Sequence, residues 1–233
     1  MKKTLLIVVS VCLLGVGLYL AFGKDDTAAD QSSNKQPKAT TQSNHTSSSA
    51  APTELFIGNA NAPIMIIEYG DYKCPKCNDF HQKAGKDIRR EWVDSGKAKI
   101  IYRPYPLFGE DSGLALYASF CAAEQGKFTA YHDTMFSFMW DNYFSKSNFD
   151  ATTQKLFSPE RLGELAGEAG LDAAAFTTCA GGRTHATAYN LTVDKAASDS
   201  VQGTPTLIIG GQKIVGPQPY SVYKALLEIE SAK

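Results

Sequence analysis

Residues 64–77 read Ile-Met-Ile-Ile-Glu-Tyr-Gly-Asp-Tyr-Lys-Cys-Pro-Lys-Cys, and this stretch decides the fold. Its first half is an apolar, β-branched run of the kind that forms a buried strand. After the second cysteine, apolar residues recur every four positions at Phe80, Ala84, Ile88 and Trp92. This spacing is typical of an amphipathic helix, and Ser95-Gly96 would end it. The stretch therefore predicts a strand, a tight turn that carries two cysteines, and a helix.

The position of each cysteine predicts its role. Cys74 lies at the expected N-terminus of the helix, where free backbone N–H groups and the helix dipole stabilise a thiolate, and Lys73 and Lys76 add positive charge. Pro75 suits the first helical turn, where its missing N–H costs nothing. Cys77 falls on the apolar stripe, so its sulfur is expected to face inward. We therefore predict that Cys74 is the nucleophile and Cys77 the resolving thiol.

A second motif lies far along the chain, at residues 201–211, Val-Gln-Gly-Thr-Pro-Thr-Leu-Ile-Ile-Gly-Gly. The run from Thr206 is rich in β-forming residues and ends at a Gly-Gly turn, which predicts a strand and a hairpin. Pro205 would stand at the start of that strand, where no ladder N–H is required.

A strand, a Cys-x-x-Cys helix and a later Gly-Thr-Pro-Thr-Leu resemble the thioredoxin superfamily. Residues 62–75 resemble its DsbA-like branch, especially the membrane-tethered BdbD-type proteins, and the resemblance covers about residues 53–233. It implies an α/β thioredoxin fold with an inserted helical domain. It also implies that Pro205 is cis and faces the Cys74 sulfur, while the Thr204 backbone binds an extended substrate strand.

The resemblance implies further site residues. Glu68 matches the buried acidic residue of this family, which can relay the proton of the resolving thiol. The usual lysine partner of that residue is not evident, and Arg103 is a candidate to replace it. Pro75 and Lys76 flank the nucleophile, and we assign them to substrate binding.

Helical spacing recurs between about residues 107 and 180, where a minimal thioredoxin fold has no counterpart, so a four-helix insertion is expected there. Cys121 and Cys179 both fall on it. We favour a structural disulfide between them over two buried free thiols, since free thiols are hazardous beside a disulfide oxidant. Within the insertion, the Met and aromatic residues of 135–140 either pack internally or offer an apolar surface to unfolded substrates.

The N-terminal part differs in composition. Lys2 and Lys3 precede an apolar run, Thr4 to Phe22, long enough to span a bilayer, so residues 1–23 are predicted to be an uncleaved signal anchor or a signal peptide. Residues 24–52 lack Val, Leu, Ile, Met and aromatic side chains and are predicted to form a disordered linker. The remaining domain, 53–233, is then expected at the extracytoplasmic face of the membrane, or secreted if the signal is cleaved.

Residues 53–233 carry 18 basic and 21 acidic side chains without a basic stripe, which argues against binding to nucleic acid. The resulting prediction is a thiol:disulfide oxidoreductase that introduces disulfide bonds into reduced, exported proteins. The resemblance implies that a membrane quinone-linked partner of the DsbB or VKOR type would reoxidise it. The Cys74–Cys77 disulfide would serve as the redox centre, with no separate cofactor and no metal.

Two alternatives remain open at this stage. The same cysteine pair would serve a disulfide reductase or isomerase, which differs in redox potential and electron source. A thiol metal carrier, with His81 as third ligand beside Cys74 and Cys77, is the alternative from another class.

Overall fold

The computed structural model describes residues 53–233, and the signal anchor and linker predicted for residues 1–52 lie outside the described residues. The five strands are β1 (Leu55–Gly58), β2 (Ile64–Gly70), β3 (Ala98–Pro104), β4 (Thr206–Ile209) and β5 (Gln212–Val215). The helices are α1 (Pro75–Gln82), α2 (Ala84–Ile88), α3 (Gly109–Glu124), α4 (Phe128–Asn142), α5 (Pro159–Glu168), α6 (Ala173–Gly182), α7 (Ala186–Ser198) and α8 (Tyr220–Ser231). Short helical turns occur at Arg89–Val93, Phe144–Lys146 and Phe149–Thr152. Within 53–233, no helix is both long and apolar enough to cross a membrane.

The strands form one mixed sheet in the order β1-β3-β2-β4-β5. The central strands β2 and β3 run parallel, while the three other pairs are antiparallel. Glu68 of β2 stands opposite Tyr102 of β3, and Tyr69 stands opposite Arg103. Because side chains alternate along a strand, Glu68 and Tyr102 share one face of the sheet, and Tyr69 and Arg103 share the other.

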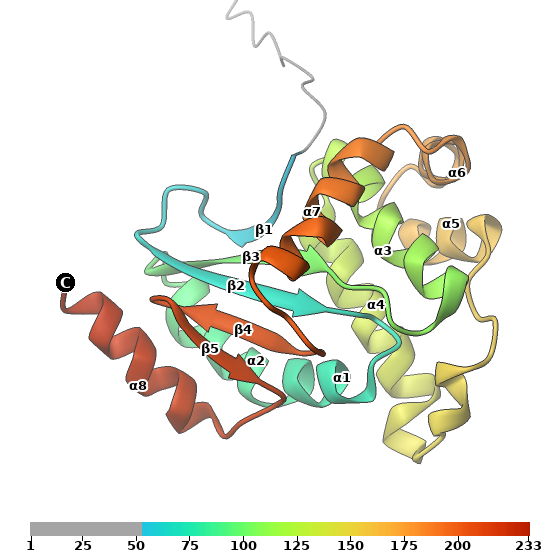
Figure 1. Cartoon of the computed structure of the whole chain (residues 1–233). Helices are drawn as coiled ribbons and strands as arrows, with labels where there is room; N and C mark the ends of the chain where they lie inside the picture. Colours follow the sequence, from blue (N-terminus) through green and yellow to red (C-terminus); the bar gives the residue numbers. More distant parts are fainter. Residues whose placement is uncertain (1–52) are drawn as a thin grey trace, which may run out of the picture. The chain divides into compact units, whose positions relative to one another are not determined.

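Helices cover both faces of the sheet (Figure 1). Helix α7 lies on the Tyr69 face and contacts β3, whereas α2 and α8 pack together on the opposite face with α1 beside them. A hairpin joins β4 to β5 through Gly210 and Gly211, both with positive φ, which is why the turn requires glycine. The sheet therefore carries α1, with the two cysteines, at the carboxyl end of β2.

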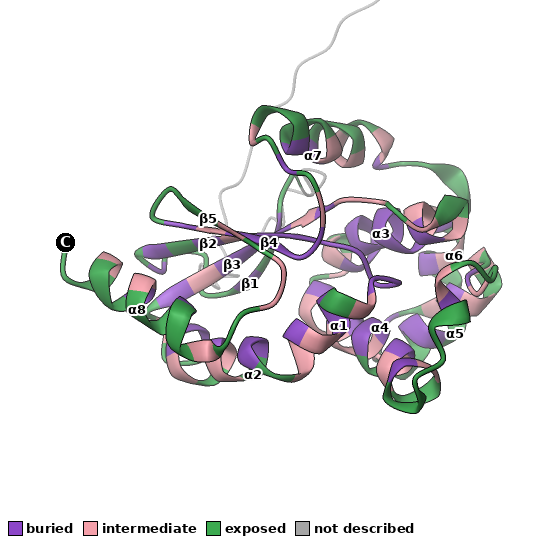
Figure 2. Ribbon diagram, turned by 60° about the horizontal axis from the view of Figure 1, so that its bottom comes forward, coloured by how far each residue is buried: buried purple, intermediate pink, exposed green. Residues whose placement is uncertain are grey.

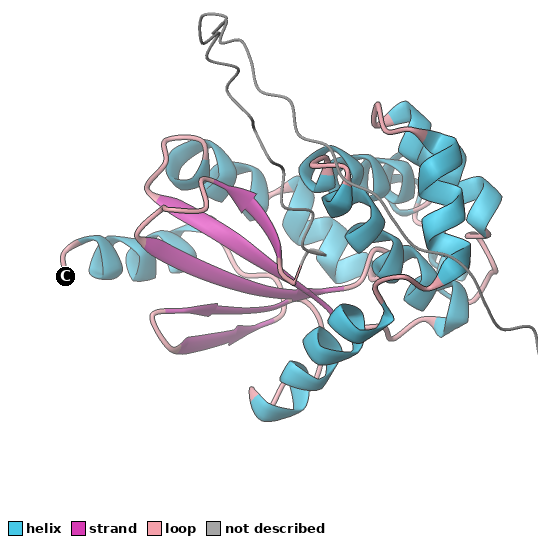
Figure 3. Ribbon diagram, turned by 90° about the horizontal axis from the view of Figure 1, so that it is seen from above, coloured by secondary structure: helices cyan, strands magenta, loops and turns pink. Residues whose placement is uncertain are grey.

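Helices α3 to α6 form the insertion and gather at one end of the sheet (Figure 3). A disulfide joins Cys121 of α3 to Cys179 of α6, with their Cα atoms 5.9 Å apart. The bridge closes a 58-residue separation, which contributes about 4 kcal/mol in the chain-entropy model. The insertion is therefore held together covalently as well as by its core.

One local expectation differs from the structure, and one open alternative is decided for two residues. The helix after Cys77 does not run unbroken, because it is interrupted at Lys83, whose φ of −112° and ψ of −101° are not helical. The four apolar residues of its stripe are nevertheless buried. Met135 and Met139 are fully buried in the core of the insertion, so they offer no surface to a substrate. Figure 2 shows buried stretches on helix α4, which carries both residues. These two residues pack internally, which is the first of the two alternatives for residues 135–140.

Candidate active site

The loop between β2 and α1 holds Cys74 as the N-cap of the helix. The backbone N–H of Cys77 donates to the Cys74 Sγ at 3.4 Å, as expected for a side chain that caps a helix start. Asn78, buried directly after the motif, donates from Nδ2 to the carbonyl of Tyr72 at 2.8 Å and to that of Cys74 at 3.0 Å. These bonds tie the cysteine loop to the first turn of α1. Pro75 occupies the first turn and Lys76 is exposed beside it.

A second loop, directly before β4, contacts the cysteine loop. The peptide bond between Thr204 and Pro205 is cis, and β4 begins at the next residue. The Cys74 thiol donates to the Thr204 carbonyl at 3.5 Å across 130 residues of sequence. Thus β2 and β4, which are hydrogen-bonded neighbours in the sheet, bring the two sequence motifs together.

The surroundings shift the pKa values of the two thiols in opposite directions. Hydrogen bonding with Cys77 is the largest influence on Cys74, and with contributions from Thr204 and the Cys77 N–H it lowers the pKa of Cys74 to about 7. Burial is the largest influence on Cys77 and raises its pKa well above 9. Both side chains are buried, with Cys74 retaining 4% of its exposure and Cys77 none. The site therefore has one thiol suited to nucleophilic attack and one held protonated.

Lys73 does not act as the sequence suggests. Its side chain is fully buried and turned toward the insertion, where its Nζ binds both carboxylate oxygens of Asp111 at 3.0 Å. The carbonyls of Phe108 and Gln154 accept from the same ammonium group at 3.2 and 2.7 Å. The expectation that Lys73 stabilises the Cys74 thiolate is wrong, because Asp111 neutralises its charge. The backbone N–H of Cys77 and the hydrogen bonds with Cys77 and Thr204 stabilise the Cys74 thiolate instead.

Glu68 is buried on the α1 side of the sheet. Burial is the main cause that raises its pKa from 4.5 to about 8, and Arg89 is the opposing positive charge. Its Oε1 has no hydrogen-bond partner among the described residues. Both Glu68 and Cys77 act electrostatically on Tyr102, which shows that the carboxyl group and the resolving thiol lie near the same ring.

Arg103 does not replace the lysine partner of Glu68. It lies on the opposite face of the sheet, where its Nη1 donates to Asp199 at 2.7 Å and to the Tyr69 hydroxyl at 2.8 Å. The alternation of side chains along β2 and β3 explains this placement. The positive charge that acts to lower the pKa of Glu68 is that of Arg89, a residue that the sequence analysis does not identify as part of the site.

Asp71 is a further site residue that the sequence pattern did not reveal. Its buried carboxylate accepts from the N–H of Lys73 at 2.9 Å, from the N–H of Leu107 at 2.8 Å and from the Ser112 hydroxyl. It thereby fastens the cysteine loop to the start of the insertion, and its charge opposes ionisation of Cys74. An isolated Asp three residues before a cysteine carries no distinctive signal, so only the fold identifies it.

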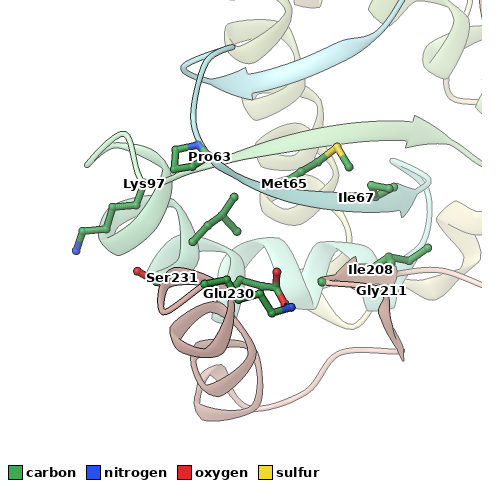
Figure 4. Close-up of a pocket in the computed structure, with 11 residues that line it drawn as sticks. Pro63, Met65, Ile67, Lys97, Ile208, Gly211, Glu230 and Ser231 are labelled. Atoms are coloured by element: carbon green, nitrogen blue, oxygen red, sulfur yellow. The ribbon is translucent and has the colours of Figure 1, made fainter.

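One pocket of the described surface does not include the thiols. This pocket of about 720 Å³ lies between β2, β4 and the end of α8, with Met65, Ile208 and Glu230 in its lining (Figure 4). Neither Cys74 nor Cys77 lines it.

The site combines a helix that begins with Cys-x-x-Cys and a facing loop with a cis-proline. Together with the fold, this arrangement defines a thioredoxin-like protein. The family model described as Thioredoxin matches residues 50–229, and the chain belongs to this family. The chain is 25% identical to disulfide bond formation protein D of Bacillus subtilis over 177 residues, 75% of each protein.

Two further comparisons agree with this assignment. The chain is 29% identical to the probable disulfide bond formation protein D of Bacillus cereus over 89 residues, a match that spans 37% of this chain and 41% of that protein. The crystal structure of oxidised BdbD from Bacillus subtilis superposes with a TM-score of 0.68 at 24% identity, covering 78% of this chain and 94% of that one. The fold is thus the thioredoxin-like α/β fold with a helical insertion.

Proposed function

We propose that this protein is an extracytoplasmic thiol:disulfide oxidoreductase that introduces disulfide bonds into exported proteins. The observation that carries the proposal is the opposite shift of the two thiols of one Cys-x-x-Cys loop, a lowered pKa at Cys74 and a raised pKa at Cys77. The names of the curated relatives from Bacillus, which describe disulfide bond formation, support the direction of the reaction.

The reaction begins from the Cys74–Cys77 disulfide. A substrate thiolate attacks the Cys74 Sγ, a mixed disulfide forms, and Cys77 leaves as a thiolate that takes up a proton. A second substrate thiolate then attacks the substrate sulfur of the mixed disulfide and releases the Cys74 thiolate. The substrate loses two electrons and gains one disulfide, and the enzyme holds both electrons as a dithiol. No cofactor is required, because the electron pair moves between sulfur atoms.

The neighbouring residues have defined tasks in these steps. The N-terminus of α1 and the hydrogen bonds at Cys74 stabilise its thiolate as a leaving group. Glu68, with a pKa of about 8, is able to exchange protons near neutral pH and would serve the protonation of Cys77. Pro205 and Thr204 would align the substrate strand against the sulfur, with Pro75 and the exposed Lys76 on the opposite side of the approaching chain.

The substrates would be reduced or unfolded exported proteins, and the reduced enzyme would be reoxidised by a quinone-linked membrane partner of the DsbB or VKOR type. The apolar segment of residues 4–22 supports tethering on the extracytoplasmic side, with the linker of 24–52 between membrane and domain. His81, the third ligand of the alternative metal carrier, groups with His132 and Asp133 in the described domain.

The redox potential of the Cys74 and Cys77 pair separates an oxidase from a reductase or isomerase. A Cys74 pKa of about 7 is higher than that of the strongest oxidants and close to that of thioredoxin, so the redox potential, and not the pKa, separates the two directions. We expect equilibration with glutathione to give a value between roughly −220 and −120 mV. A value near about −270 mV, that of thioredoxin, would replace the oxidase assignment with a reductase.

A further inference from the structure

A cluster of potential metal ligands lies on the inner side of the active-site helix. His81 of α1 meets His132 and Asp133 of α4, and one ligand atom of each lies within 4.8 Å of the others. His81 Nε2 is 3.5 Å from Asp133 Oδ1. His81 comes one helical turn after Cys77, yet neither catalytic cysteine belongs to the cluster. The group is thus distinct from the thiol site while sharing its helix.

The imidazole ring of His81 is held by packing, without good hydrogen bonds to the described residues. Both of its nitrogen atoms are buried, and neither makes a hydrogen bond of good geometry with the described residues, because the contact of Nε2 with Asp133 is 3.5 Å long. The imidazole stacks on Phe136, with ring centroids 4.4 Å apart, which fixes its orientation. Buried polar atoms are nearly always satisfied in folded proteins, so two unpartnered nitrogens on one ring require an explanation such as a bound ion.

His132 has the support that a ligating histidine commonly has. Its Nδ1 lies 3.4 Å from the hydroxyl of Tyr72, which in turn lies 2.8 Å from the hydroxyl of Ser119. Donation from Nδ1 to the Tyr72 hydroxyl would leave the lone pair of Nε2 free for an ion.

Asp133 provides the third donor and an opening to solvent. Arg89 donates to its Oδ1 at 2.8 Å, while no hydrogen bond from the described residues ends on Oδ2. A carboxylate often binds a metal through one oxygen and accepts a hydrogen bond at the other. The side chain of Asp133 is 42% exposed and that of His81 is 17% exposed, so an ion and its water ligands have access.

We propose that His81, His132 and Asp133 bind one divalent transition-metal cation of the zinc type, with water completing the coordination. Two imidazoles and one carboxylate match zinc, whereas calcium and magnesium require oxygen ligands. The bound ion would fasten the active-site helix α1 to helix α4 of the insertion. Because the site exists only in the folded protein, the ion would stabilise the fold by mass action. The proposal is independent of the proposed redox function.

The test uses the full chain with Cys74→Ser and Cys77→Ser, so that the active-site thiols cannot bind the probe. Thermal unfolding is measured with Zn²⁺, with Ca²⁺ and without added metal, and Co²⁺ is titrated as a spectroscopic probe. We expect Zn²⁺ but not Ca²⁺ to raise the unfolding temperature. One equivalent of Co²⁺ should give visible d–d bands without a thiolate charge-transfer band.

Two ligand variants and one matched control complete the design. His81→Asn and Asp133→Asn should each weaken Co²⁺ binding at least tenfold, about the smallest loss expected for a residue supporting a metal. Asp79→Asn removes a carboxylate from the same helix, where Asp79 pairs only with Lys83 in the described part of the chain, and should bind Co²⁺ as the parent does. Unfolding of each variant without metal establishes that it folds.

Three results would overturn the proposal. The first is the absence of any Co²⁺ spectrum or Zn²⁺ stabilisation in the folded parent. The second is undiminished binding in folded His81→Asn and Asp133→Asn proteins, which would place the ion elsewhere. The third is equal stabilisation by Ca²⁺, which would exclude imidazole ligation as the basis of binding.

Discussion

At the scale of single residues, the chemistry depends on the difference between two thiols three positions apart. Cys74 accepts from the Cys77 N–H and donates its own thiol proton to the Thr204 carbonyl. Cys77 is completely buried, and burial penalises its thiolate. Cys74 is therefore a good leaving group. Cys77 must gain a proton when the active-site disulfide is reduced and lose it when the disulfide forms again.

Alkylation of the reduced protein measures this difference. Since the pKa of Cys74 is about 7 and that of Cys77 is well above 9, iodoacetamide should label Cys74 first, with a rate that is half-maximal near pH 7. Peptide mapping by mass spectrometry identifies the labelled residue at each pH. Equal labelling of both thiols, or a midpoint at pH 9, would show that the helix start does not stabilise Cys74.

Glu68 leads to a prediction about stability. Its pKa is about 8 in the folded protein and close to 4.5 when exposed, so the folded protein holds a proton that the unfolded chain releases between these values. Stability should therefore fall as pH rises from about 4.5 to 8, by on the order of 4 kcal/mol for this group alone. Glu68→Gln, which is neutral at every pH, should flatten that part of the curve.

Denaturant unfolding of the parent and of Glu68→Gln across this pH range tests the prediction, and Glu54→Gln serves as an exposed control. If the two curves run parallel, Glu68 is ionised in the folded protein and the proton-relay role loses its basis.

Several residue assignments could be made from the sequence and others could not, for physical reasons. The N-cap position of Cys74 and the inward position of Cys77 follow from local periodicity. The charge of Lys73 was assigned to the wrong neighbour, because its partner Asp111 lies 38 positions away and only tertiary packing joins them. Arg103 was paired with Glu68 because its strand neighbours β2, but the register places them on opposite faces.

At the scale of elements, the cysteine loop is anchored to α3 by two buried polar contacts. Lys73 binds Asp111, and Asp71 accepts from Ser112 one position further along the same helix. A buried ion pair that loses one partner leaves an uncompensated charge, which is costly. The loop geometry therefore depends on the insertion as well as on the strand that precedes it.

Lys73→Met tests this anchoring. It should destabilise the protein by about 3 to 5 kcal/mol, because Asp111 would be left without its cation. The alkylation midpoint of Cys74 should stay near pH 7, since the Lys73 ammonium faces Asp111. Lys76→Met, at an exposed position, is the control for stability. A rise of a full pH unit in the Cys74 midpoint of Lys73→Met would restore the direct electrostatic role.

Helices and strands with a clear apolar periodicity or special turn residues can be predicted from the sequence. Elements that form only through contacts with other parts of the fold cannot. The strand at 64–70, the helix after Cys77 and the Gly210-Gly211 hairpin carry local signals. Strand β1 is four residues long and exists through its pairing with β3, so nothing in its own sequence singled it out. The active-site helix is interrupted at Lys83, two positions before Gly85, although the apolar spacing continues through this point.

At the scale of the whole described domain, the sheet brings together two motifs that are 130 residues apart. Strands β2 and β4 pair so that Cys74 reaches the carbonyl preceding the cis-proline. The insertion between them is closed by the Cys121–Cys179 bridge. Sequence reasoning obtained this architecture from the resemblance of the paired motifs, because spacing alone does not specify which strands become neighbours.

The most direct test of the proposed oxidase is transfer of the disulfide itself. The oxidised protein is mixed without oxygen with a reduced, unfolded protein that contains two cysteines, and mass spectrometry after thiol labelling counts the products. We predict one new disulfide in the substrate for each Cys74 and Cys77 pair that becomes reduced, an unchanged Cys121–Cys179 bridge, and no transfer with Cys74→Ser. A substrate that stays reduced while Cys74 and Cys77 stay joined would contradict the account, as would transfer that persists in Cys74→Ser.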